Sequence, residues 1–121
     1  MSEALAKLDG KKVLVVEDDY LIAMGLGRSF EDEGAEVLGP VGRVETALEL
    51  IARETSIDGA VLDINLAGDL VFPVADALFA RGVPFVFSTG YDADAVPAPY
   101  REVPRYRKPV LPRSVRDALF A

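Results

Sequence analysis

The hydrophobic positions of the chain follow two alternating patterns. Residues 12–17, 59–64 and 83–88 are short apolar runs with no helical period, which is typical of strands covered on both faces. Between these runs, apolar residues recur near helical spacing over residues 20–33 and again over 44–51. This alternation predicts buried parallel strands separated by helices.

Weaker segments complete the pattern. They are a short strand at 35–38, a helix around 74–78 that ends at Gly82, a strand near 104–107 and a short last helix at 111–120. Five strands alternating with helices predict an α/β fold, an open doubly wound parallel sheet with helices on both faces. Gly34 is a candidate C-cap for the first helix.

Two segments depart from this regularity. Residues 91–103 contain Pro97 and Pro99 and have little periodicity, so we expect at most a turn or two of helix between the fourth and fifth strands. Residues 1–10 are interpreted as a short polar N-terminal leader, followed by one domain over 11–121. A length of 121 residues with 50% hydrophobic positions suits one compact domain.

Composition narrows the chemistry. The chain has no cysteine, which excludes disulfides and thiolate metal sites, and it has no histidine, so a phosphohistidine must come from another molecule. No apolar run approaches the length of a membrane span, and we expect a cytoplasmic protein without a membrane partner. The net charge is −7, although residues 101–121 are basic. A solvated basic face is favoured there over a nucleic-acid site.

Polar residues stand at the ends of four predicted strands. Glu17, Asp18 and Asp19 end the first strand, Asp63 the third, Ser88 and Thr89 the fourth and Lys108 the fifth. In a doubly wound sheet these strand ends converge on one rim. Clustered carboxylates need a cation, and oxygen ligands favour Mg²⁺ (or Mn²⁺) over zinc. Asp63 can then attack phosphorus, while the metal and Lys108 neutralise phosphoryl oxygens and Thr89 donates a hydrogen bond.

Each of these residues also has a structural interpretation. Asp18 or Asp19 can cap the following helix, Asp63 can be a loop aspartate, Thr89 with Gly90 can form a turn, and Lys108 can be solvated. The joint pattern, in this order and at these strand ends, is what indicates a phosphoryl-transfer site.

The motifs VLVVEDD, AVLDINL, FSTGY and RKPV resemble those of receiver domains of bacterial two-component systems, over residues 11–120. The resemblance implies a flavodoxin-like fold with strand order 2-1-3-4-5. It implies a phospho-acceptor at Asp63, a switch hydroxyl at Thr89 and the family's lysine at Lys108, with a cis bond to Pro109. Glu17, Asp18, Asp63 and the backbone carbonyl of Asn65 are the implied metal ligands. The implied donor is a sensor histidine kinase or a histidine phosphotransfer protein.

A narrower resemblance lies in PFVFSTGY, residues 84–91, which is similar to the PFxFATG[G/Y] motif of a stand-alone receiver subgroup. Ser88 replaces the alanine of that motif. The subgroup is associated with alphaproteobacterial kinase relays, including general stress-response signalling. It implies a receiver that has no output domain of its own.

The chain also departs from ordinary receivers. Arg105 occupies the position of the usual aromatic switch residue, three before the lysine, and Tyr91 and Tyr106 are candidate replacements. With Gly90 and Asn65, Tyr91 is also a candidate for tuning phosphoaspartate hydrolysis, although its ring can equally pack on the loop. We hypothesise that residues 91–116 form the face that binds an unknown downstream protein, using segment 91–103 and basic residues at Arg101, Arg105, Arg107, Arg113 and Arg116.

Two other functions use similar residues. A haloacid-dehalogenase-like phosphohydrolase also combines aspartate, threonine, lysine and Mg²⁺, but its nucleophile opens the chain in a DxD motif. Here the acidic pair comes first, and no second acid stands two residues after Asp63. A binding module that works without phosphorylation would not need the acceptor, the lysine and the acids, all of which are present. The sequence favours a phosphorylation switch that is not an enzyme acting on other substrates.

Overall fold

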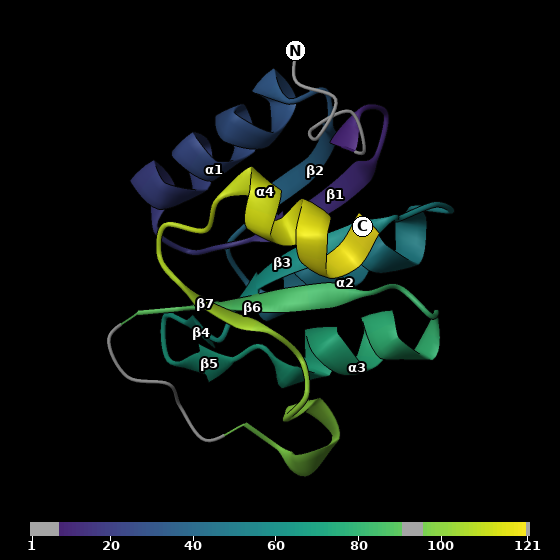
Figure 1. The fold of residues 1–121 in the computed structure, drawn as a ribbon. Helices are drawn as coiled ribbons and strands as arrows, with labels where there is room; N and C mark the ends of the chain where they lie inside the picture. The colour runs from purple at the N-terminus through teal and green to yellow at the C-terminus, as the bar shows by residue number, and fades with distance from the viewer. Residues whose placement is uncertain (1–7, 91–95, 121) are drawn as a thin grey trace.

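A five-stranded parallel sheet forms the centre of the protein (Figure 1). A computed structural model describes residues 8–90 and 96–120. The sheet strands are β1 (Lys12–Val16), β2 (Glu36–Val41), β3 (Gly59–Asp63), β6 (Phe85–Thr89) and β7 (Arg105–Arg107). Their spatial order is β2-β1-β3-β6-β7, which confirms the predicted order 2-1-3-4-5 when only the sheet strands are counted.

Helices cover both faces of the sheet (Figure 1). One face carries α1 (Tyr20–Asp32) and the C-terminal α4 (Pro112–Val115), which continues as a π-helical turn, η3 (Arg116–Phe120). The other face carries α2 (Val44–Arg53) and α3 (Phe72–Ala80). Within the described ranges, none of the helices is long and apolar enough to cross a bilayer.

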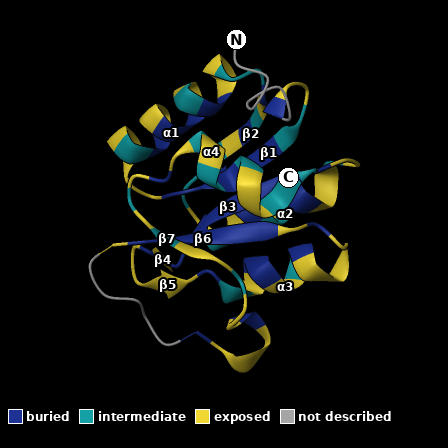
Figure 2. Cartoon of the chain, in the orientation of Figure 1, coloured by how far each residue is buried: buried dark blue, intermediate teal, exposed yellow. Residues whose placement is uncertain are grey.

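Successive side chains of each strand point to opposite faces of the sheet, so the core has two parts. Val13, Val15, Val61 and Val86 pack toward α1 and α4, whereas Leu14, Leu62 and Phe87 pack toward α2 and α3. Figure 2 shows the central strands as buried, with exposed residues on the outer sides of the helices. Strands buried on both faces explain the apolar runs without a period.

The C-cap of α1 is Glu33, and Gly34, the expected C-cap, follows it directly. Gly34 has a φ of +92°, and its amide donates to the Glu31 carbonyl at 2.9 Å. The amide of Ala35 donates to the Phe30 carbonyl at 3.1 Å, so two terminal carbonyls of the helix are satisfied. The chain thereby turns from α1 into β2.

Two features of the strands differ from the sequence expectation. β2 runs to Val41 instead of ending at Leu38, because its register on β1 shifts and Val41 pairs with Val16 beyond the Gly39–Pro40 interruption. A small antiparallel pair, β4 (Asn65–Leu66) and β5 (Asp69–Leu70), follows β3 and is too short to have a periodic pattern.

The N-terminal residues that are described also differ from the leader interpretation. Leu8 is completely buried, and the Gly10 amide donates to the Gly34 carbonyl at 2.9 Å. Residues 8–10 therefore belong to the packed domain. Residues 1–7 lie outside the described part of the chain.

The segment between β6 and β7 is the one where we expected at most a turn or two of helix. In the described part of the segment between β6 and β7, the helical structure is the 3₁₀ turn η2 (Ala98–Tyr100), as the prolines predict. Tyr100 from this turn is 5% exposed and packs among Phe72, Phe85 and Phe87, at ring-centroid distances of 6.3, 5.8 and 6.3 Å. Its hydroxyl donates to Asp76 on α3. One aromatic ring thus helps to cover the sheet where helix is lacking.

Candidate functional site

The predicted site residues meet at the carboxyl-terminal rim of the sheet. Glu17 and Asp63 are each 4% exposed, and Thr89 is 8% exposed. Lys108 Nζ lies 2.9 Å from Glu17 Oε1 and 3.0 Å from Asp63 Oδ2. The sheet register pairs Asp63 with Ser88 and Thr89 with Arg107, so the ends of β3, β6 and β7 lie side by side.

Three carboxylates form one cluster at this rim. Glu17, Asp18 and Asp63 each offer an oxygen, and these atoms lie within 4.8 Å of one another. Lys108 donates a hydrogen bond to Glu17 Oε2 at 3.1 Å, while Glu17 Oε1 is buried without a hydrogen-bond partner despite the nearby ammonium. An oxygen with free lone pairs, beside two further carboxylates, fits a hard divalent cation.

The electrostatics of the cluster make Asp63 easier to protonate than an ordinary aspartate. Burial raises the pKa of Asp63 to about 7, the hydrogen bond from Lys108 opposes this, and the charge of Glu17 raises the pKa further. Burial alone lowers the pKa of Lys108, but its hydrogen bonds to Glu17 and Asp63 outweigh burial and raise it overall. A cation at the rim would favour ionised Asp63, the form that can act as a nucleophile.

Asp19 has a different role from its two acidic neighbours. Asp19 Oδ1 accepts a hydrogen bond from the Ile22 amide at 3.1 Å and caps α1. The Asp19 amide donates to Glu17 Oε2 at 3.0 Å, which orients the buried carboxylate. The structure thus resolves the two interpretations of this acidic run, since Asp19 caps the helix and Asp18 joins the cluster.

Two backbone features complete the rim. The Asn65 amide donates weakly to Asp63 Oδ1 at 3.4 Å, and Asn65 Oδ1 accepts from the Gly68 amide at 2.8 Å. Asn65 therefore forms the turn that follows the nucleophile candidate, and metal ligation by its backbone carbonyl stays a prediction. The peptide bond between Lys108 and Pro109 is cis, as the resemblance implied.

The structure closely matches solved proteins. SdrG from Sphingomonas melonis Fr1 is 40% identical, with a TM-score of 0.78 over 91% of this chain and 93% of that one. A structure of the BeF3-activated conformation of SdrG, from Pseudomonas melonis Fr1, is 39% identical, with a TM-score of 0.71 over 98% and 96% of the two chains.

Two further structures carry the family in their descriptions. The PhyR response regulator REC domain from Erythrobacter litoralis is 27% identical, with a TM-score of 0.75 over 91% of this chain and 87% of that one. A response regulator from Burkholderia pseudomallei, with a phosphorylated aspartic acid and a calcium ion, is 27% identical, with a TM-score of 0.73 over 90% and 66%. The chain belongs to the response-regulator receiver family. By sequence alone, no family model and no curated protein matches it, so the assignment rests on structural comparison.

The described candidate switch residues of this receiver differ in their exposure to solvent. Arg105 is exposed on the edge strand β7, whereas Tyr106 is partly buried and packs toward the α1 side of the core. Tyr91 lies outside the described residues, so its roles stay predictions. Sequence reasoning missed Tyr100, because this aromatic stands in a proline-containing segment with no periodic pattern to mark it as core.

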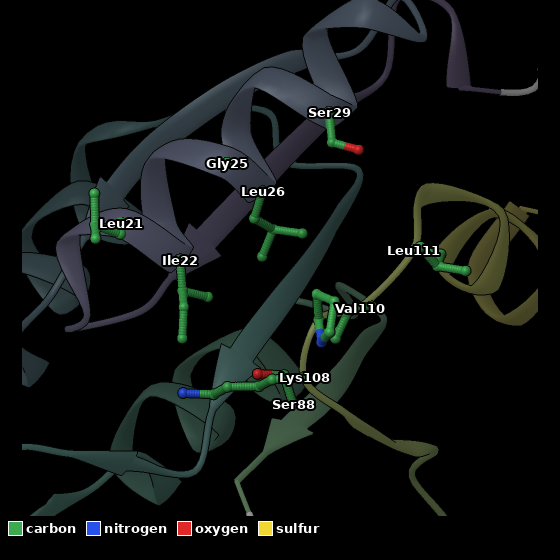
Figure 3. Close-up of a pocket in the computed structure, with 10 residues that line it drawn as sticks. Leu21, Ile22, Gly25, Leu26, Ser29, Ser88, Lys108, Val110 and Leu111 are labelled. Atoms are coloured by element: carbon green, nitrogen blue, oxygen red, sulfur yellow. The ribbon is translucent and has the colours of Figure 1, made fainter.

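A cavity of about 280 Å³ separates α1 of the receiver from the segment that follows β7. Figure 3 shows Ile22 and Leu26 of α1 facing Val110 across this space, with Lys108 along its lower border. Leu21 at its edge is 80% exposed. Apolar surface therefore adjoins the charged rim, where the sequence had marked these α1 residues only as apolar positions of a helix.

Proposed function

We propose that this receiver domain accepts a phosphoryl group on Asp63, with a divalent cation, from a sensor histidine kinase or a histidine phosphotransfer protein. The observation that carries the proposal is the position of Lys108 Nζ, within 3.0 Å of Asp63 inside a buried carboxylate cluster. A buried carboxylate that lies beside a lysine ammonium and beside a candidate metal site is suited to hold a transferred phosphoryl group.

The residues present fit Mg²⁺ or Mn²⁺ as the cation. Glu17, Asp18 and Asp63, with the backbone carbonyl of Asn65, would hold it, and the three carboxylate oxygens within 4.8 Å of one another support this assignment. When bound, the ion neutralises charge on the phosphoryl oxygens. The calcium ion and phosphorylated aspartic acid described for the Burkholderia pseudomallei regulator are consistent with the same use of this rim.

The chain's own residues then have distinct roles in the transfer. An Asp63 carboxylate oxygen forms the new bond to phosphorus as the bond from phosphorus to the donor imidazole nitrogen breaks, and the imidazole leaves with the electron pair. Lys108 places positive charge beside the oxygens that gain charge, and the Thr89 hydroxyl donates to one of them. Later attack by water returns Asp63 to a free carboxylate. The protein thus promotes its own phosphorylation and dephosphorylation and does not turn over other substrates.

The downstream half of the proposal concerns the 91–116 face. Here the Arg105 position lacks an aromatic ring, and the described segment 96–104 contains one short 3₁₀ turn. Around the packed Tyr100, this segment has few cooperative backbone hydrogen bonds, so a change of charge at Asp63 can alter its order there. We propose that this change controls binding of a downstream protein in a cytoplasmic stress-response relay. Unchanged hydrogen-exchange protection across residues 91–110 on adding BeF3⁻ and Mg²⁺ would contradict it.

The decisive experiment for the acceptor role is intact-mass measurement after incubation with acetyl phosphate and Mg²⁺. We expect a mass gain of one phosphoryl group that Asp63→Asn abolishes. Asp69→Asn, an exposed aspartate on β5, is the matched control and should leave the gain intact. Absence of any gain, even with a cognate kinase, would favour a binding module that keeps the fold. Turnover of a generic phosphomonoester would instead favour a phosphohydrolase.

A further inference from the structure

A separate cavity opens on the rim beside the phosphoryl-acceptor residues. It has a volume of about 510 Å³, and its walls are Asp19, Ile22, Thr89, Gly90, Arg107 and Lys108. Thr89 and Lys108 belong to the proposed acceptor site, and Lys108 reaches Asp63. Arg107 does not belong to that site, and no step of the proposed transfer to Asp63 uses it. The cavity therefore extends from the acceptor site toward the edge strand β7.

The cavity wall holds two basic side chains, Arg107 and Lys108, and one acid, Asp19. Lys108 is already balanced by ion pairs with Glu17 and Asp63, at 2.9 and 3.0 Å. Asp19, the acid in the wall, uses Oδ1 to cap α1. Arg107 is exposed and takes part in an interaction already, but a guanidinium has five N–H donors and can accept an anion as well.

The position of Arg107 relates it to the transfer reaction. The register pairs Arg107 with Thr89, whose hydroxyl is proposed to bind the phosphoryl group. The next residue, Lys108, contacts the nucleophile. Arg107 lines the cavity next to the phosphoryl site without being one of the proposed phosphoryl ligands. It is therefore placed to contact the leaving group of the phosphoryl donor.

Phosphoryl donors differ in the charge of their leaving group. In an acyl phosphate, the bond between phosphorus and the acyl oxygen breaks as Asp63 bonds to phosphorus, and the electron pair stays on a departing carboxylate. In phosphoramidate, the bond between phosphorus and the protonated nitrogen breaks and neutral ammonia departs. Negative charge therefore develops on the leaving group only with the acyl phosphate, and a nearby guanidinium stabilises that charge.

We propose that this cavity receives the acyl end of a small acyl phosphate and that Arg107 recognises the departing carboxylate. The inference rests on the proposed role of Asp63 as acceptor. It makes Arg107 a residue that determines donor specificity, because a donor whose leaving group is neutral gains nothing from its charge.

The test compares initial rates of Asp63 phosphorylation, measured by intact mass with Mg²⁺, for acetyl phosphate and for phosphoramidate. We expect Arg107→Gln to slow the reaction with acetyl phosphate by about fivefold or more and to change the phosphoramidate rate by less than about twofold. Arg107→Lys, which keeps the charge, should recover part of the loss. Arg53→Gln, which changes an exposed arginine at the end of α2 that is not in the cavity wall, is the control and should leave both rates unchanged.

Several outcomes would overturn the inference. They are equal slowing with both donors, no slowing with acetyl phosphate, or an equal effect of Arg53→Gln. A wild-type protein that takes phosphate from a histidine phosphotransfer protein but not from acetyl phosphate would also overturn it, while leaving the acceptor role of Asp63 standing. A wild-type protein that no donor phosphorylates would instead remove the proposed function itself.

Discussion

The rim at the ends of β1 and β3 and the edge around Tyr100 are built on opposite principles. The rim buries Glu17 and Asp63 close together, with Lys108 as their common cation. The edge buries an aromatic ring that touches other rings and donates one hydrogen bond to Asp76. Like charges in a cluster lower stability, whereas ring packing raises it. The reactive part of this receiver is thus held in place by the rest of the fold.

The largest effect that this contrast predicts is at the edge. Tyr100→Ala should lower the free energy of unfolding by about 3–5 kcal/mol, because a buried ring leaves a cavity. Tyr100→Phe removes only the hydroxyl, and its cost should be about 1 kcal/mol. Urea denaturation measures both changes. A loss below about 1 kcal/mol for Tyr100→Ala would mean that the ring does not support the sheet.

The next largest effect is expected at the rim, where the Lys108 ammonium forms ion pairs with Glu17 and Asp63. Lys108→Met should lower the free energy of unfolding by about 2–3 kcal/mol, less than for a fully buried pair because Lys108 keeps some exposure. Arg43→Gln, which breaks an exposed ion pair with Glu45, should cost less than about 1 kcal/mol. Equal costs for the two variants, in parallel urea titrations, would contradict the special position of Lys108.

A smaller effect of opposite sign is expected at the nucleophile. In metal-free protein at pH 8, Asp63→Asn should raise the free energy of unfolding by about 1–2 kcal/mol, since it removes one of three clustered charges. The pKa of Asp63 is raised to about 7, so its stabilising contribution is present below pH 3.8 and is lost as the pH rises through 7. The gain should therefore shrink at pH 5. Melting curves at both pH values check this, and a gain that is larger at pH 5 would contradict it.

The smallest effect separates two neighbouring acids. Asp19→Ala should cost about 1 kcal/mol through loss of the α1 cap and should leave phosphorylation of Asp63 intact. Asp18→Asn should change stability little but weaken Mg²⁺ binding, which titration calorimetry measures. Similar Mg²⁺ affinities of the Asp18→Asn variant and the wild type would remove Asp18 from the metal site.

Much of this site was predictable because its residues mark the ends of apolar runs. Glu17, Asp63 and Thr89 stand at the ends of buried strands and Lys108 follows the edge strand β7, and parallel strands bring those ends to one edge. The short β4 and β5 pair, the extension of β2 to Val41 and the buried Leu8 were not predictable. Each depends on a partner strand or on packing that no local pattern encodes.

By itself the sequence determined the class of fold, the strand order through its family resemblance, and the residue types at the rim. The fold class follows from local periodicity and from the handedness of parallel connections. The tertiary structure alone decided that Asp19 caps α1 while Asp18 joins the cluster, that Lys108 bridges two acids, and that Tyr100 fills the edge. The last two contacts join residues 91 and 24 positions apart, a distance over which only folding decides which groups meet.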